Sequence, residues 1–208
     1  MPKLKLTKTA LKAQTDELKR FTRFLPTLQL KKQQLQLEMR KSQALLDANE
    51  KAFEAARHRI ARWSALFGDS GAVEFFTRAI RITGVDEGED NIAGVIVPVF
   101  NRLEFELADL DLFATDFYVS EAVNAVCELL SLVEASRILR RQHALLAHEL
   151  RTTTQRVNLF EKVKIPECRE NIRKIRIYIS DQETSAVARC KLAKGKAQAA
   201  EQEGGNAA

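Results

Sequence analysis

An apolar ladder with alternating steps of three and four residues runs through the first third of the chain. A period near 3.5 residues held over so many turns places one narrow apolar seam on a long helix, and a second helix must cover such a seam. Four polar residues interrupt the ladder: Gln14, Lys32, Ser42 and Asn49. Its apolar members are Leu11, Leu18, Phe21, Leu25, Leu28, Leu35, Met39, Leu46, Phe53, Ala56, Ile60, Trp63 and Phe67.

A second apolar stripe follows in the C-terminal third of the chain. Leu146, Val157, Cys168 and Ile179 recur at steps of eleven residues, which is close to the period of a straight helix. The stripe is completed by Val123, Val126, Leu130, Val133, Leu150, Phe160, Ile165, Ile172 and Ile175. Because the chain reverses between the two stripes, we expect the two helices to pair antiparallel, with both termini at one end.

The segment between the two stripes has a different composition. Residues 75–83 and 92–100 are β-branched or aromatic, and they flank a polar, glycine-bearing connection at 84–91. This pattern predicts a β-hairpin, with Pro98 at an edge or a strand end. Residues 103–113 fit either a strand or a short helix. A two-stranded hairpin is marginal alone, so it must pack on the helices or on a partner.

These patterns predict a mainly α-helical fold, a long antiparallel two-helix coiled coil with a small middle head that contains a β-hairpin. The expected parts are an N-terminal helix at 1–67, an acidic head at 68–119, a C-terminal helix at 120–194 and a disordered tail at 195–208. Thr7 or Thr9 is the expected N-cap of the first helix. Pro26 and Pro166 predict a bend in each long helix.

Charge is unevenly distributed along the chain. Residues 67–136 carry 14 acidic and 3 basic side chains, a net charge of −11, although the whole chain has a net charge of +5. The remainder therefore carries +16. Two basic arms and an acidic middle suggest different partners at the two ends, since summed charge steers association. The simpler alternative is that long helices need charge for solubility.

No pattern in the sequence predicts a catalytic residue, a cofactor site or a metal site. His143 and His148 are five residues apart and do not share a helix face. Gly84, Gly88 and Gly94 lack the lysine of a phosphate-binding loop. The carboxylates Asp109, Asp111 and Asp116 lack the glycine and the glutamate of a calcium loop. We expect the cysteines, Cys127, Cys168 and Cys190, to be small buried or seam thiols in a reducing compartment.

The apolar segments are too short for a membrane span. The longest run, residues 93–100, contains a proline and falls far short of the roughly 20 residues that a helix needs to cross a bilayer. The first residues alternate lysine and leucine and lack the apolar region of a signal peptide. We therefore expect a soluble, intracellular protein without direct membrane insertion.

A dense cationic stretch in the C-terminal third leaves a second function open. It consists of Lys162, Lys164, Arg169, Arg173, Lys174 and Arg176. A basic helical hairpin could bind nucleic acid or an acidic membrane surface through such charge. Only Phe160 and Tyr178 lie nearby as aromatic residues for base stacking, and no recognition-helix motif is present, so we expect no nucleic acid partner.

Four segments together carry a family resemblance: residues 6–12 (LTKTALK), 25–38 (LPTLQLKKQQLQLE), 91–95 (NIAGV) and 157–176 (VNLFEKVKIPECRENIRKIR). The chain resembles the D subunit of the V/A-type rotary ATPases in its bacterial form. The F-type gamma subunit is also built on a terminal coiled coil, but its middle domain is a larger α/β unit than about 50 residues can form.

The resemblance implies a non-catalytic central rotor shaft that couples ATP hydrolysis or synthesis to ion translocation through a membrane ring. The implied partners are the ring of catalytic A and regulatory B subunits, the F subunit, and the socket subunit of the membrane ring. The implied location is cytoplasmic and peripheral, on the inner face of the cell membrane. Nucleotide sites would belong to the ring.

The resemblance and the charge pattern suggest two contact regions. We expect the tip that enters the ring to be lined by Leu6, Lys8, Leu11, Lys12, Lys191 and Lys194. We expect Arg169, Arg173 and Arg176 to meet acidic loops of the ring. We expect Glu87, Glu89 and Asp90 in the acidic head to dock the foot partners.

Overall fold

The computed structural model describes residues 4–64, 72–108 and 117–205. The element order is α1 (Lys8–Ser64), α2 (Ala72–Ala79), β1 (Ile80–Ile92), β2 (Val95–Leu107), α3 (Phe117–Leu159), a π-helical turn η1 (Phe160–Lys164) and α4 (Ile165–Gly205). The described part is therefore mainly helical with a central hairpin, as predicted. Phe67, the glycine-bearing segment 68–71, Asp109, Asp111 and Asp116 lie outside the described residues.

The chain divides into two compact units. One consists of Met1–Gln29 and Gln155–Ala208, and the other of Leu30–Thr154. The first unit, called here the terminal unit, contains the start of α1, the end of α3, η1 and α4. The second, called the hairpin unit, contains the rest of α1, the hairpin and most of α3.

The N-terminus of α1 is capped by Thr7. The Ala10 N–H donates to Thr7 Oγ1 at 3.2 Å, and the Leu11 N–H donates to the Thr7 carbonyl at 3.0 Å. These bonds satisfy amide groups that have no partner inside the helix. The helix continues without interruption through Pro26, whose side chain is exposed. The helix thus accommodates the proline, and the predicted bend there stays a prediction.

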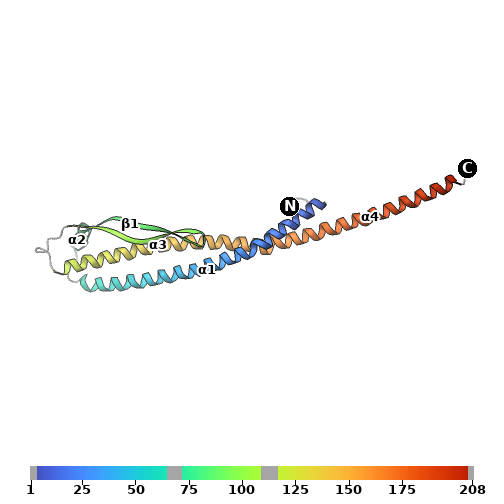
Figure 1. Cartoon of the computed structure of the whole chain (residues 1–208). Helices are drawn as coiled ribbons and strands as arrows, with labels where there is room; N and C mark the ends of the chain where they lie inside the picture. Colours follow the sequence, from blue (N-terminus) through green and yellow to red (C-terminus); the bar gives the residue numbers. More distant parts are fainter. Residues whose placement is uncertain (1–3, 65–71, 109–116, 206–208) are drawn as a thin grey trace. The chain divides into compact units, whose positions relative to one another are not determined.

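In the hairpin unit, α1 and α3 pair antiparallel along the predicted seam (Figure 1). Lys31 Nζ lies 2.8 Å from Glu149 Oε1, and Arg59 Nη2 lies 2.6 Å from Glu128 Oε1. Residues later in α1 thus contact residues earlier in α3, as antiparallel helices require. Ladder residues face the seam: Leu35 and Ala56 are fully buried, and the interrupting Ser42 is buried with them.

The hairpin exists, but the predicted strand positions were wrong. Residues 75–79 belong to α2, and the expected connection at 84–91 is the second part of β1. The turn lies later, at Ala93 and Gly94, which have positive φ values of 53° and 79°. Positive φ at both central residues is typical of a type I′ turn, whose twist matches that of the two strands. The Gly94 N–H donates to Asn91 Oδ1 at 2.9 Å and stabilises this turn.

The acidic stretch of β1 misled the prediction because aspartate, glutamate and glycine are poor strand formers. Their cost is small here because most of these side chains are exposed on a two-stranded ribbon. Two register shifts further loosen the pattern, since Thr83 on β1 and Asn101 on β2 have no partner across the ladder. Each shift is a β-bulge, which changes the face on which the following side chains lie.

The hairpin packs lengthwise on α3 of its unit (Figure 1). At its base, the buried residues Ala79 and Ile80 contact Val119 and Val123. At its turn, Val97 packs against Leu35 and Leu146, and all three are fully buried. The two clusters lie about 35 Å apart along α3, at 1.5 Å per residue. The hairpin is therefore anchored on α3 at its base and on both α1 and α3 at its turn.

This packing changes the role of the first part of the C-terminal stripe. Val123, Val126 and Leu130 pack against the hairpin base. Val133, which continues this part of the stripe in the sequence, is 42% exposed. Periodicity alone could not separate the hairpin-facing side of α3 from its α1-facing side, because both are apolar.

The terminal unit contains a second antiparallel helix pair. Asn171 Nδ2 donates to Gln14 Oε1 at 3.2 Å, and the rings of Phe21 and Phe160 have centroids 4.9 Å apart. Packing is lighter on the α1 side, because none of the described side chains up to Gln29 is buried. On α4 the predicted stripe is buried, with Ile165, Cys168, Ile172 and Ile175 at most 9% exposed.

Just before Pro166, where a bend was predicted, the helix contains the π-helical turn η1, and the bend itself stays a prediction. The Ile165 N–H donates to the Phe160 carbonyl, five residues back instead of four. Proline has no N–H and its ring collides with the carbonyl four residues earlier in a regular α-helix. The π-helical turn has a larger radius than an α-helical turn and lies directly before the proline.

The ends of the C-terminal helix differ from the prediction. The helix begins at Phe117, before Ser120, and α4 continues to Gly205. Residues 195–205 are thus helical in the structure, whereas we expected a disordered tail from 195. Lys, Ala, Gln and Glu are good helix formers, and extending an existing helix avoids the cost of nucleation.

Candidate partner-contact surfaces

Three arginines share one face of α4 in the terminal unit. Arg169, Arg173 and Arg176 follow each other at steps of four and three on α4, and all are exposed. They border a shallow groove of about 400 Å³ whose apolar lining includes Leu18 and Ile172. The structure therefore brings these predicted residues together on one face, with an apolar strip between their aliphatic stems.

Glu170 neutralises part of this surface. Its carboxylate accepts two hydrogen bonds from Arg173, from Nε and from Nη2, both at 3.1 Å. The hydrogen bond lowers the pKa of Glu170 and raises the pKa of Arg173, because each partner stabilises the charged form of the other. Arg169 and Arg176 have no carboxylate within ion-pair distance in the described chain, so their charges remain available to a partner.

The predicted tip residues do not all lie at one level. Lys8 Nζ lies 2.9 Å from Glu183 Oε1, so the start of α1 is level with Glu183. Lys191 and Lys194 lie eight and eleven residues further along α4, about 12 and 16 Å beyond that pair. All described side chains from 180 to 198 are exposed. Of the remaining predicted tip residues, Leu6 and Lys12 are exposed and Leu11 is half-buried.

The predicted acidic residues of the hairpin are exposed but divided between its faces. Side chains alternate along a strand, so Glu87 and Glu89 share one face of β1 while Asp90 lies on the other. Opposite Asp90 is the fully buried Val97, and opposite Glu89 is Pro98. Glu87 Oε2 also lies 3.7 Å from Arg141 Nη1 on α3.

The structure reveals a surface that sequence patterns did not predict, on the Glu89 side of the hairpin. Ile96 pairs with Asn91 across the ladder and is 63% exposed. Pro98 and Phe100 continue the same row of β2 beside Glu89 and Glu87. An apolar row beside carboxylates suits a partner surface with apolar and basic groups. Only the register of the hairpin reveals it, because the prediction placed the turn incorrectly.

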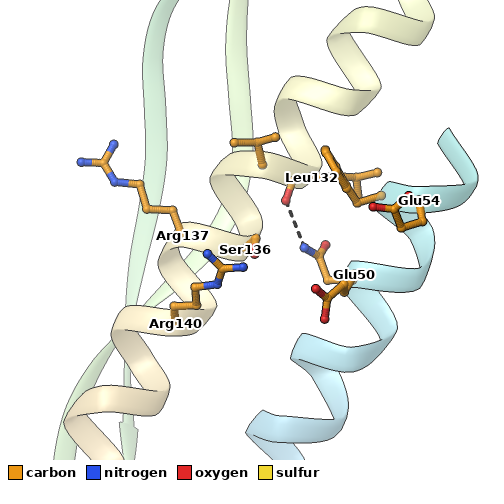
Figure 2. A pocket seen from close by; sticks show the side chains of 9 residues that line it. Glu50, Glu54, Leu132, Ser136, Arg137 and Arg140 are labelled. Atoms are coloured by element: carbon orange, nitrogen blue, oxygen red, sulfur yellow. Dashed lines mark hydrogen bonds between the residues drawn. The ribbon is translucent and has the colours of Figure 1, made fainter. Parts of the chain in front are cut away.

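A groove between α1 and α3 of the hairpin unit is a further candidate (Figure 2). Asn49 lies in it and donates from Nδ2 to the Leu132 carbonyl at 3.0 Å. Glu50 and Glu54 line the groove on α1, while Arg137 and Arg140 line it on α3. Glu50 and Arg140 have no ion-pair partner in the described chain. The groove volume is about 380 Å³, and its walls carry opposite charges.

The described residues contain no cluster of three or more His, Cys, Asp or Glu side chains that could hold a metal ion. In the same part of the chain no helix is long and apolar enough to span a bilayer. Cys168 is buried on the seam as expected, and burial raises the pKa of its thiol. Cys190 is exposed, contrary to the expectation of buried thiols.

The described residues form paired long helices and a hairpin that lies along α3, which is the architecture of a mainly helical protein. Comparison with known proteins identifies the family. The family model for the D subunit of ATP synthase matches residues 10–195. The chain belongs to this family and is the non-catalytic D subunit in the central stalk of a V-type ATP synthase.

Individual relatives agree over nearly the whole chain. The V-type ATP synthase D subunit of Borreliella burgdorferi is 42% identical over 194 residues, which cover 93% of this chain and 95% of that protein. The D subunit of Chlamydia felis is 34% identical over 200 residues, which cover 96% of each chain. The D subunit of Chlamydia caviae is 33% identical over 202 residues, with the same coverage.

Proposed function

We propose that this chain is the rotor shaft that couples ATP hydrolysis or synthesis in a ring of catalytic A and regulatory B subunits to ion translocation through a membrane ring. Its membership of the D-subunit family supports this role, as does the pairing of its two long helices in each unit. The complex would hold the chain at the cytoplasmic side of the cell membrane. The chain itself would contribute neither nucleotide chemistry nor ion binding.

The terminal unit would enter the ring. The exposure of α4 carries this assignment: its described side chains from 180 to 198, among them Lys191 and Lys194, are all exposed. A segment that turns inside a ring needs contacts that break easily, and exposed charges separated by water give weak, salt-screened contacts. Arg169 and Arg176, which have no acidic partner in the described chain, would meet acidic loops of the ring.

The hairpin unit would carry the foot partners, namely the F subunit and the socket subunit. Glu87 and Glu89 would form the charged part of this contact, and Ile96 its apolar part. Asp90 lies on the other face of β1 and would contribute less. Reversing the charge with Glu87→Lys and Glu89→Lys should weaken binding of the F subunit. Unchanged binding would exclude this surface, and the groove at Asn49 would become the next surface to test.

Cys190 allows a direct test of the ring assignment. A cleavable linker joining the Cys190 thiol to ring amines should stop ATP turnover, and cleavage of the linker should restore it. Cys190→Ser treated in the same way is the matched control and should stay active throughout. If the linker joins the two components and turnover continues, α4 does not rotate in the ring. If the chain binds nucleic acid or lipid vesicles and does not bind the ring, the alternative function of a basic helical hairpin replaces the rotor function.

A further inference from the structure

The buried stripe of the C-terminal helix slips by one residue at η1. Before the π-helical turn, the seam-facing positions follow steps of four and three: Leu146, Leu150, Thr153, Val157 and Phe160. After it, they follow steps of three and four: Ile165, Cys168, Ile172, Ile175 and Ile179. The step from Phe160 to Ile165 is five residues. Continuing the earlier pattern would have placed the next members at 164, 167, 171 and 174.

The π-helical turn therefore absorbs one inserted residue. An i to i+5 hydrogen bond encloses one residue more than the α-helical bond, so a stripe can keep its direction across the insertion. The structure contains this bond, from the Ile165 N–H to the Phe160 carbonyl. A chain one residue shorter would continue the regular stripe, so burial of the seam does not itself require η1.

Hydrogen bonding makes this turn a soft point of the helix. The Glu161 carbonyl would normally accept from Ile165 in an α-helix or from residue 166 in a π-helix. The Ile165 N–H instead donates to the Phe160 carbonyl, and Pro166 has no N–H to donate. The Ile165 N–H can therefore exchange one acceptor for the other without changing the number of bonds. None of the five residues of η1 is buried, so little side-chain packing opposes the exchange.

The facing helix offers few rigid contacts here. Phe21 packs its ring on Phe160, and the described residues of α1 in this unit have no buried side chain. Pro26 lies beyond Phe21 in the direction of residue 155, whereas Pro166 lies on the other side of the ring pair. The two prolines are thus separated along the helix pair, and each helix is weakened at a different level.

We propose that η1 is a torsional joint of the C-terminal helix, in which Ile165 exchanges its acceptor between the carbonyls of Phe160 and Glu161 so that α4 twists about the helix axis. The seams on the two sides of the turn remain packed during small twists. The inference rests on the proposed rotor function, because rotation under load would supply the twist. Elastic twist at this joint would smooth the transfer of torque between steps of the motor.

Two variants separate the joint from the proline. The first combines deletion of Val163, which is 49% exposed, with Pro166→Ala, and it restores an uninterrupted α-helical stripe. The second, Pro166→Ala alone, keeps the inserted residue and is the matched control. Circular dichroism first establishes that both full-length chains keep their helix content. Fast exchange should persist in the control, because in the α-helical pattern the new alanine N–H at position 166 would donate to the Lys162 carbonyl and leave the Glu161 carbonyl available to Ile165.

Amide hydrogen exchange on the full chain is the first readout. Removing the joint should slow exchange at residues 160–165 by about fivefold, the equivalent of one net hydrogen bond of about 1 kcal/mol. The control should exchange like the unaltered chain. Equal exchange in both variants would overturn the proposal, since the inserted residue would then confer no softness.

The second readout is the width of angular fluctuations of a bead on the foot end of a stalled, reconstituted complex. The joint-free variant should give a narrower distribution than Pro166→Ala. Slower exchange with an unchanged width would overturn the mechanical role, because twist would then be stored elsewhere. If even the unaltered chain does not enter the ring, the rotor function fails, and the exchange result alone decides whether η1 is a joint.

Discussion

Leu146→Ala tests whether the hairpin turn is anchored as the structure indicates. Leu146 is fully buried and packs with Leu35 of α1 and Val97 of β2, so truncating it opens a cavity that three elements share. Removing a buried leucine side chain costs about 2–5 kcal/mol in free energy of unfolding, depending on how far the cavity collapses. A value of about 3 kcal/mol is reasonable, because the half-buried Met39 and Leu150 beside it can partly fill the space.

The neighbouring Leu145 provides a matched control. It is 39% exposed, so Leu145→Ala should change the free energy of unfolding by less than about 0.5 kcal/mol. Thermal unfolding followed by circular dichroism should show a melting temperature roughly 6–12 °C lower for Leu146→Ala and nearly unchanged for the control. Equal shifts in the two variants would refute the cluster, because the loss would then reflect helix propensity alone.

Three further predictions concern single positions. Asn49→Leu replaces a polar seam residue with an apolar one and should raise the free energy of unfolding by about 1 kcal/mol, which urea unfolding can measure. The same change removes the hydrogen bond to the Leu132 carbonyl, which helps to fix the register of the two helices. Disulfide mapping should therefore detect more than one register. Maleimide labelling near neutral pH should modify Cys190 quickly and Cys168 slowly, because burial protects Cys168 and raises its pKa; equal rates would contradict the seam position. The Glu170 contribution to stability should be present at neutral pH and lost on acidification below its ordinary pKa of 4.5, because its folded-state pKa is lowered; Glu170→Gln should flatten that part of the stability profile.

The helical parts of the fold could be predicted from the sequence because their signals are long and redundant. The ladder around Leu35 and Ala56 repeats over many turns, so a few polar interruptions do not hide it. The cap at Thr7 follows from local chemistry, because the threonine hydroxyl accepts from an amide that has no partner in the first turn. Each of these signals depends on residues within one or two turns of the feature that they predict.

The hairpin register could not be predicted in the same way. The turn depends on a positive φ at Ala93, a residue type that rarely adopts this conformation, and the strand contains an acidic stretch with low strand propensity. What holds it is the distant contact of Val97 with Leu35 and Leu146. The division of Glu87, Glu89 and Asp90 between two faces follows from that register. The sequence therefore could not show that these three carboxylates do not share one face.

That Arg169, Arg173 and Arg176 share one helix face could be predicted from their spacing. The electrostatics of this face could not, because the pairing of Arg173 with Glu170 depends on rotamers. The groove at Asn49 could not be predicted either, since its walls come from two helices distant in the sequence. Local periodicity thus predicts which side chains share a face, and tertiary packing decides which charges remain free.

The rotor function requires this chain to be a single shaft within a ring of A and B subunits. The most direct measurement is size-exclusion chromatography with light scattering on the purified chain, the F subunit and that ring, followed by an ATPase assay on the isolated complex. The rotor function predicts one chain per ring and a changed rate of ATP turnover. A chain that elutes apart from the ring, or binds in several copies without altering turnover, would contradict it.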